Sequence, residues 1–439
     1  MKITRKMAAG AAFAATAALV LTACGGNGNN ASGPATEAPD EKPASLTLAT
    51  WTNVSPETLQ AFEDETGIAV TIQNFADSQA AQSAIQAGLT AGGAGLSDVH
   101  FLEGDWLTEM FAHPDDWAEL PAVDGRWVDW TVERGKSDDG AIRGYGTDIG
   151  PLAVAFNSEI MEELGLPSTP DAFADFIGGA DGTWEDFIAA GQQVVEASNG
   201  DVRFVDTITT SMQAAINLIP GGAFEDPETG NPIPVEDNET IHELFMMFAN
   251  AIEGDSTISA NINFWEDGWS TGFHQKQFAA VIAPAWMTGM VQQAAEGVTG
   301  WQVATTFPGG GGNWGGSFLA VPSTGDNIYW ATQLADFLTT PEAAIAQFEV
   351  ENQFPSQVEA LEDPRLMETP NEFFGGQHLG AVYSELAAGT PTLTFRGQQF
   401  TAIQNIFMEA LGRVMDGIET PEEAWTSSVA NFNAQVDMG

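Results

Sequence analysis

The sequence has little with which to crosslink its fold or to hold a metal ion. Its 439 residues include one cysteine, Cys24, and five histidines. A single cysteine excludes a disulfide within the chain, so the fold must rest on its hydrophobic core. The histidines are scattered, and none stands with carboxylates at the spacing of a metal site. We therefore expect neither a metal nor a cofactor.

Basic residues are also rare. Thirteen Lys and Arg stand against 61 Asp and Glu, which gives a formal net charge of −48. A field of that sign repels nucleic acids and anionic lipid surfaces, and it disfavours anionic ligands. The glycine run at 309–312 is not followed by Lys-Ser or Lys-Thr, so it is not a P-loop. A Gly-x-Ser-x-Gly elbow is missing as well. These absences argue against nucleic acid partners and against several enzyme classes.

The N-terminus has the pattern of an export signal. Lys2, Arg5 and Lys6 precede an Ala-rich apolar run at 7–20, and Leu-Thr-Ala-Cys follows at 21–24. This order is typical of a secretory signal, and the apolar run is short for a membrane span. An ordinary soluble signal is the alternative. However, the only cysteine stands at the expected cut, in a motif that resembles the bacterial lipobox.

We therefore expect residues 1–23 to be removed and Cys24 to carry a lipid. The lipid alone would hold the protein on the outer face of the cell membrane. Residues 25–45 are rich in Gly, Asn, Pro and Ala and have no large apolar side chain. Such a segment cannot bury enough surface to order itself, so 24–45 is predicted to be a flexible tether.

The remaining chain alternates between strand and helix patterns. Strands are predicted at 46–50, 68–72, 98–102 and 152–156. Helices are predicted after Ser55, at 78–90, and after the N-cap threonines Thr183, Thr340 and Thr420. This order is typical of parallel sheets with helices on their faces. We predict a two-lobed α/β protein whose chain crosses between the lobes more than once.

Several segments, taken in order, resemble the extracellular solute-binding proteins of ABC sugar importers, the family that includes maltose-binding protein. The matching segments are Ala49-Thr50-Trp51, residues 61–68, Thr147-Asp148-Ile149-Gly150-Pro151, residues 156–159 and 183–187, residues 278–286, Asn313-Trp314-Gly315-Gly316-Ser317 and residues 352–356. Together they span most of 46–430. Asn-Trp-Gly-Gly-Ser, Phe-Pro-Ser and the late Phe373-Phe374-Gly375-Gly376 look most like actinobacterial binding proteins for cello- and xylo-oligosaccharides.

The resemblance implies the type II periplasmic-binding-protein fold, or Venus flytrap. Each lobe would contain a mainly parallel sheet flanked by helices, and the lobes would close on a ligand about a hinge. By analogy, lobe 1 would hold 46–149 and 314–353, and lobe 2 would hold 152–310 and 354–439. The family also implies a monomer that passes a small saccharide to the permease subunits of an ABC importer, and no catalytic residue.

Four tryptophans are candidates for stacking on a sugar, whose flat C–H faces suit aromatic rings. Trp51 follows the first strand, at the edge where ligands bind in open α/β sheets. Trp106 follows the third strand, Trp286 follows the apolar run at 278–284, and Trp314 stands among glycines at the proposed crossing. Trp265, Trp269 and Trp301 are weaker candidates.

Five further residues are candidates for hydrogen bonding to a ligand. Asp105 and Asp148 would accept bonds from hydroxyls. For Asp148 the alternative is an aspartate that caps amides in a turn, and the family resemblance, which places this segment at the cleft, favours the ligand site. Gly315 and Gly316 would let backbone amides approach a ligand, or form a plain hinge loop. Arg396 is one of few basic residues, and it would either donate to hydroxyls or pair with one of the many acids.

Two other functions remain open on sequence grounds. Polyamine-binding proteins share this architecture and use carboxylates with Trp, which the acidic composition suits. A secreted glycosidase would need two carboxylates at a fixed separation, and 61 acidic residues leave such a pair available.

Overall fold

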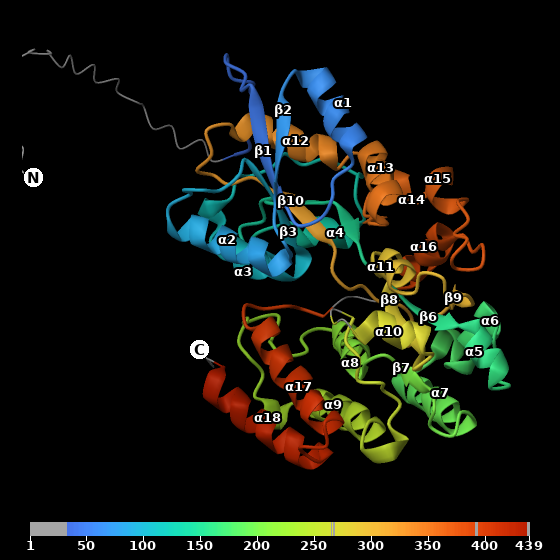
Figure 1. Ribbon diagram of the computed structural model, residues 1–439. Coiled ribbons are helices and arrows are strands. Elements are labelled where there is room, and N and C mark those ends of the chain that lie inside the picture. Colours follow the sequence, from blue (N-terminus) through green and yellow to red (C-terminus); the bar gives the residue numbers. More distant parts are fainter. Residues whose placement is uncertain (1–32, 265, 267, 391–393, 437–439) are drawn as a thin grey trace, which may run out of the picture. The chain divides into compact units, whose positions relative to one another are not determined.

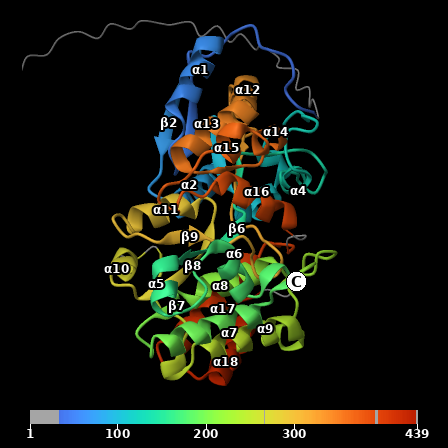
Figure 2. The same cartoon turned by 90° about the vertical axis from the view of Figure 1, so that its right-hand side faces the viewer.

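The computed structural model of the protein describes residues 33–264, 266, 268–390 and 394–436. The predicted signal at 1–23 and the predicted lipid site Cys24 lie outside these residues, as does Trp265. Figure 1 and Figure 2 show the arrangement of the helices and strands.

The first sheet has five strands in the order β2-β1-β3-β10-β4. The strands are β1 Ser45–Thr50, β2 Ala69–Asn74, β3 Val99–Glu103, β4 Tyr145–Gly146 and β10 Ser317–Ala320. β1 runs parallel to both β2 and β3, whereas β10 runs antiparallel to β3 and β4. The three strands predicted at the start of the body are therefore confirmed, each to within two residues at its ends.

Helices cover both faces of this sheet because its side chains alternate between them. On one face Phe101 and Leu319 pack against Phe62 of α1 (Pro56–Thr66) and against α12 (Ile328–Leu338). On the other face Leu102 packs against α2 (Ser78–Thr90) and α3 (Leu107–Phe111). Both views show α12 beside α1 and α13 (Pro341–Glu351).

The second sheet has four strands in the order β7-β8-β6-β9. They are β6 Leu152–Asn157, β7 Arg203–Val205, β8 Phe278–Pro284 and β9 Trp301–Val303. The prediction of a mainly parallel sheet is wrong here, because β6 runs antiparallel to β8 and β9, and only β7 and β8 are parallel. Strand and helix patterns identify the elements, but they do not set the direction in which a strand enters the sheet.

A large aromatic core holds the second sheet to its helices. Phe156 of β6 stacks on Phe173 at a ring-centroid distance of 3.9 Å, and Phe187 packs on Phe204 of β7 at 4.8 Å. The helices of this region are α5 Ser158–Glu163, α6 Pro170–Phe176, α7 Trp184–Ala197, α8 Ile208–Asn217, α9 Glu239–Ala251, α10 Gly268–His274, α11 Met287–Ala294, α16 Leu379–Gly389, α17 Phe400–Met415 and α18 Pro421–Gln435. α9, α17 and α18 lie side by side in both views.

The predicted helix starts have the expected caps. The hydroxyls of Ser55, Thr183, Thr340 and Thr420 each accept a backbone N–H of the helix that follows. At Thr183 and Thr420 the third helical residue returns a bond to the cap backbone, which completes a capping box. The local sequence thus determines where these helices begin.

The chain passes between the two sheets at three places that lie together. β5 (Asp148–Ile149) pairs with β11 (Phe354–Pro355), and Pro151 forms an antiparallel bridge with Asn313. The backbone N–H of Trp314 donates to the carbonyl of Gly150 at 2.8 Å. The predicted repeated crossing is therefore present, while the lobe limits proposed from the family resemblance stay a prediction.

The remaining elements are short. Three are α-helices, α4 Asp129–Arg134, α14 Val358–Leu361 and α15 Pro364–Met367. The others are 3-10 helices, η1 Gly104–Trp106, η2 Pro114–Asp116, η3 Gly179–Asp181, η4 Val235–Asp237 and η5 Gly254–Ser256.

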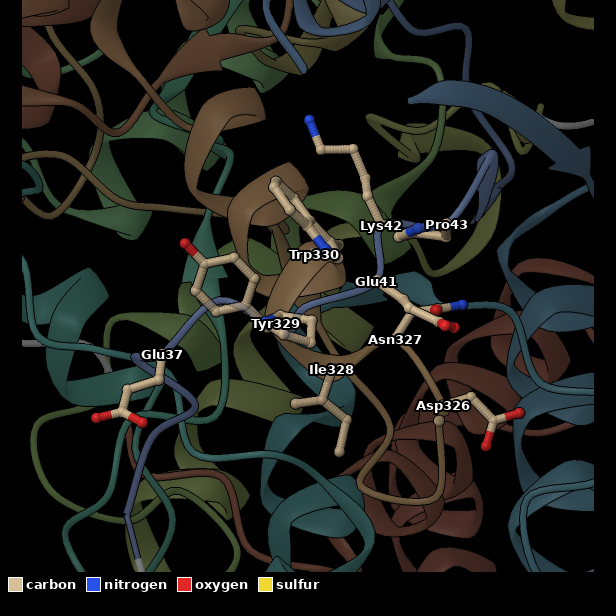
Figure 3. A pocket seen from close by; sticks show the side chains of 11 residues that line it. Glu37, Glu41, Lys42, Pro43, Asp326, Asn327, Ile328, Tyr329 and Trp330 are labelled. Atoms are coloured by element: carbon tan, nitrogen blue, oxygen red, sulfur yellow. The ribbon is translucent and has the colours of Figure 1, made fainter. Parts of the chain in front are cut away.

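The stretch 33–44, predicted as the end of the tether, contains no helix or strand but contacts the body. Lys42 Nζ lies 4.8 Å from the centre of the Trp330 ring. A cavity of about 450 Å³ lies between residues 37–43 and the start of α12, and Figure 3 shows Tyr329 and Trp330 among its lining side chains. The end of the predicted tether is therefore fixed against α12.

Candidate functional site

Two tryptophans meet at the carboxyl ends of β1 and β3. Trp51 follows β1 and Trp106 ends η1, directly after β3. Because these strands are neighbours and parallel, their carboxyl ends open at one edge of the sheet. The two rings lie 5.4 Å apart, and Trp51 also meets Phe101 edge-on at 6.1 Å. Both indoles are partly exposed and present an aromatic surface at this edge.

A second aromatic group forms at the crossing between the sheets. The Trp286 ring meets the Trp314 ring edge-on at 5.7 Å, and Trp286 Nε1 donates to the Trp314 carbonyl at 3.0 Å. Phe264 lies against Trp314 at 5.8 Å. Trp314 is 9% exposed and Trp286 is half-buried, so Trp286 offers more of its ring to a ligand. Among the described residues, no ring contact joins this group to the Trp51–Trp106 pair.

Gly315 and Gly316 are required by the geometry of the crossing. Their φ angles are +80° and +90°, a region that side-chain-bearing residues avoid. A Cβ on Gly315 would lie 3.2 Å from Glu103 Oε1 and 3.4 Å from Trp286 Nε1. A Cβ on Gly316 would lie 2.7 Å from the Asp148 carbonyl oxygen. These glycines bring β3, β5 and Trp286 close together, and their contact with a ligand stays a prediction.

Replacing Gly316 with alanine is expected to cost about 2–3 kcal/mol of stability, because strain at positive φ adds to the close approach of the Asp148 carbonyl. Gly297 is the matched control, since its φ is +81° and nothing lies within 4 Å of its added Cβ. Gly297→Ala should cost only about 1 kcal/mol. Urea unfolding measures both variants, and equal losses would contradict the close approach at Gly316.

Asp105 and Arg396 form an ion pair that connects the end of β3 to the region of α8 and α17. Arg396 Nη1 lies 2.8 Å from Asp105 Oδ2, and Arg396 Nη2 donates to Asn217 Oδ1 at 2.8 Å. Arg134 Nη2 approaches the other Asp105 oxygen at 3.4 Å. Two interpretations of Arg396 were left open, donation to ligand hydroxyls and pairing with an acid. The structure shows the pairing with an acid. Arg134 and Asn217 were not predicted from the sequence.

Asp148 lies in β5, at the crossing between the two sheets. Its Oδ1 accepts bonds from Thr147 Oγ1 at 2.7 Å and from the backbone N–H of Ser317 at 3.0 Å. The side chain is buried, and burial raises its pKa to about 6. The Asp148 carboxylate therefore caps a nearby amide, as the alternative interpretation expected. Bonding of Asp148 to a ligand stays a prediction.

Glu103 is a site residue that the sequence analysis missed. It is the last residue of β3, directly opposite Ser317 of β10, and it is half-buried. Burial and then the charges of Asp105 and Asp148 raise the pKa of its carboxyl well above the usual range, against the opposing effect of Arg134 and Arg396. The alternation of Val99, Phe101 and Glu103 along β3 was the available signal, because these residues share one face.

The weaker tryptophan candidates are structural where they are described. Trp269 and Trp301 are buried, at 4% and 1% exposure, and both contact Phe273. No group of three or more His, Cys, Asp or Glu within the described ranges has the geometry to hold a metal ion. No helix in the same ranges is long and apolar enough to cross a membrane.

Comparisons with known proteins agree with this arrangement. The family of bacterial extracellular solute-binding proteins matches residues 57–374. The structure is similar to a crystal structure of an extracellular solute-binding protein of family 1, with 27% identity, a TM-score of 0.81 and coverage of 89% of this chain and 99% of that chain. A search of curated proteins gave no match.

Two more distant structures are similar in fold. The ABC-transporter-associated binding protein of B. animalis subsp. lactis Bl-04, in complex with β-1,6-galactobiose, is 18% identical with a TM-score of 0.68, covering 89% of this chain and 97% of that one. The galacto-N-biose/lacto-N-biose I-binding protein of Bifidobacterium longum is 17% identical with a TM-score of 0.68, covering 91% and 100%. The chain therefore belongs to the family of bacterial extracellular solute-binding proteins and has the two-lobed fold of the sugar-binding proteins of ABC transporters.

Proposed function

We propose that the protein is an extracytoplasmic substrate-binding lipoprotein of an ABC importer that captures a neutral saccharide. The ligand is a short oligosaccharide, such as a cello- or xylo-oligosaccharide, held between two closing lobes. The observation that carries the proposal is the partly exposed Trp286 beside Gly315, at the point where the chain crosses between the sheets. Aromatic faces stack on sugar rings, and the neighbouring carboxylates accept bonds from hydroxyls.

Three observations support a neutral saccharide. Structures of similar fold are described with β-1,6-galactobiose and lacto-N-biose. The net charge of −48 disfavours an anionic ligand. Asp105 already forms ion pairs with the guanidinium groups of Arg134 and Arg396, and these pairs compete with the binding of an anionic ligand. The protein acts as a monomer and delivers its ligand to the permease subunits.

A thermal-shift panel tests the ligand class. Cellotriose, xylotriose, maltotriose and β-1,6-galactobiose are compared with spermidine. A polyamine is the second candidate because Glu103 places a carboxylate close to the Trp286 indole. A ligand present at 100 times its Kd adds about 2.7 kcal/mol of stability, which raises the melting temperature measurably. Stabilisation by spermidine alone would overturn the saccharide proposal, and release of product from cellotriose would indicate a glycosidase instead.

The lipid anchor gives a separate prediction. Cys24→Ala should leave saccharide binding in solution unchanged but release the protein from the cell membrane, because one residue carries the whole attachment. Cell fractionation with an antibody to the body of the protein measures this, and Ser32→Ala, in the same predicted tether, is the control. Retention of the Cys24→Ala protein in the membrane fraction would contradict the anchor.

A further inference from the structure

Glu103 lies at the end of β3, close to Gly315 and Trp286 of the candidate site. As the last residue of β3 it lies on the same face of the strand as Phe101, which contacts Trp51. Its Oε1 lies 3.2 Å from the point where a Gly315 side chain would begin, and Trp286 Nε1 lies 3.4 Å from that point. Figure 1 shows β3 beside β10, the strand that the Gly315–Gly316 turn enters. The Glu103 carboxylate thus lies close to the Trp286 indole, at the end of the strand whose Phe101 contacts Trp51.

The neighbouring carboxylates already have partners, whereas Glu103 has none. Asp105 is paired with Arg134 and Arg396, and Asp148 accepts bonds from Thr147 and Ser317. Over the described part of the chain, the Glu103 carboxylate has neither a hydrogen bond nor an ion pair. A half-buried carboxylate without a partner destabilises the folded chain. Such groups cluster at sites where a ligand supplies the missing bonds.

We propose that Glu103 is the specificity-determining residue of this cleft, a carboxylate acceptor that selects saccharides presenting hydroxyl donors and excludes those carrying an acidic group at this position. The inference rests on the proposed function and deepens it. Two hydroxyls of a neutral sugar supply two donors to the two carboxylate oxygens, and these bonds favour the ionised form that burial disfavours in the free protein. A uronic acid or a phosphorylated sugar would place a second negative charge against Glu103, with Asp105 and Asp148 close by.

Glu103→Gln is the central test, because it removes the charge and keeps the shape. With cellotriose and xylotriose as neutral probes, the variant should bind about 10- to 100-fold more weakly, which is the loss of a charge-assisted bond pair. Digalacturonate is the anionic probe. The affinity of the variant for digalacturonate, divided by its affinity for the neutral probes, should be higher than the same ratio for the wild-type protein. A purely structural role would not move this ratio. Isothermal titration calorimetry measures all three ligands.

A second measurement needs no ligand. Because the wild-type carboxylate has no partner, Glu103→Gln should raise the melting temperature of the free protein by about 2–4 °C at pH 8. Glu351 is the matched control, since its carboxylate accepts bonds from Asn53 Nδ2 at 2.6 Å and Thr52 Oγ1 at 3.4 Å, next to Trp51. Glu351→Gln should lower the melting temperature and leave the ratio of neutral to anionic binding unchanged.

The outcomes separate this inference from the proposed function. If no neutral saccharide stabilises the wild-type protein, the proposed function is wrong. If Glu103→Gln lowers the melting temperature of the free protein, Glu103 is a structural partner and the inference is wrong. Equal affinities of wild type and Glu103→Gln for cellotriose or xylotriose would also overturn it, even with the proposed function intact.

Discussion

Replacing Trp286 with alanine is expected to weaken saccharide binding by about 100-fold. The indole is half-buried beside Trp314 and Gly315, so part of its ring is available to a sugar face. Truncating a tryptophan that anchors a binding site costs about 2–4 kcal/mol, and 1.4 kcal/mol corresponds to a factor of ten in affinity. Calorimetric titration of the strongest saccharide of the panel measures the effect.

The matched control separates stacking on the ligand from the hydrogen bond that Trp286 makes at the crossing. Trp286 Nε1 donates to the Trp314 carbonyl, and alanine would lose both this bond and the ring. Trp286→Phe loses the bond but keeps an aromatic face, so it should retain most of the affinity while losing about 1 kcal/mol of stability. If the phenylalanine variant binds as weakly as the alanine variant, Trp286 acts through the crossing and does not stack on the ligand.

The sequence predicted the parts of this structure that depend on neighbours along the chain. Ser55, Thr183 and Thr420 cap helices because their hydroxyls reach amides only three residues away. Trp51 and Trp106 were placed at strand ends because strand patterns fix where a strand stops. Since β1 and β3 are adjacent and parallel, those two positions meet at one edge.

The parts that depend on distant residues were not accessible from the sequence. Arg396 reaches Asp105 across almost three hundred residues, and 61 acids offered no way to select its partner. The antiparallel entry of β6 is set by the sheet that receives it. Glu103 gave no sign in the sequence of lacking a partner, because that lack appears only once Asp105 and Asp148 are seen to be bonded elsewhere.

Ionisation of Asp206 is expected to make the protein less stable as pH rises from about 4 to about 7. Asp206 follows β7 and is 2% exposed, where it accepts bonds from Trp269 Nε1 and Thr207 N–H. Burial raises its pKa from 3.8 to about 7, and these two bonds only partly oppose that rise. Its backbone carbonyl accepts the N–H of Ile262 at 2.9 Å. Asp206 therefore anchors the segment that places Phe264 against Trp314.

The direction follows from proton binding. Because the folded-state pKa lies above that of the unfolded chain, the folded protein holds the proton more tightly between these two values. The resulting stabilisation is complete below about pH 4 and is lost as pH rises through about 7. A shift of three pKa units corresponds to about 4 kcal/mol. Asp206→Asn cannot ionise, so the stability of wild type minus that of Asp206→Asn should fall by about 3 kcal/mol between pH 4.5 and pH 8.5, because part of the stabilisation is already lost at pH 4.5.

Urea unfolding in 1 M salt measures this difference, since salt screens the repulsion among the many surface acids. Asp186 is the control with the opposite sign. Its carboxylate accepts bonds from the N–H and hydroxyl of Thr183, which lower its pKa, so its small contribution is present at neutral pH and lost as pH falls. A difference between wild type and Asp206→Asn that stays constant over this pH range would show that Asp206 keeps one protonation state throughout. The hydrogen bonds of Asp206 with Trp269 and Ile262 would then hold the Phe264 segment in place at every pH of this range.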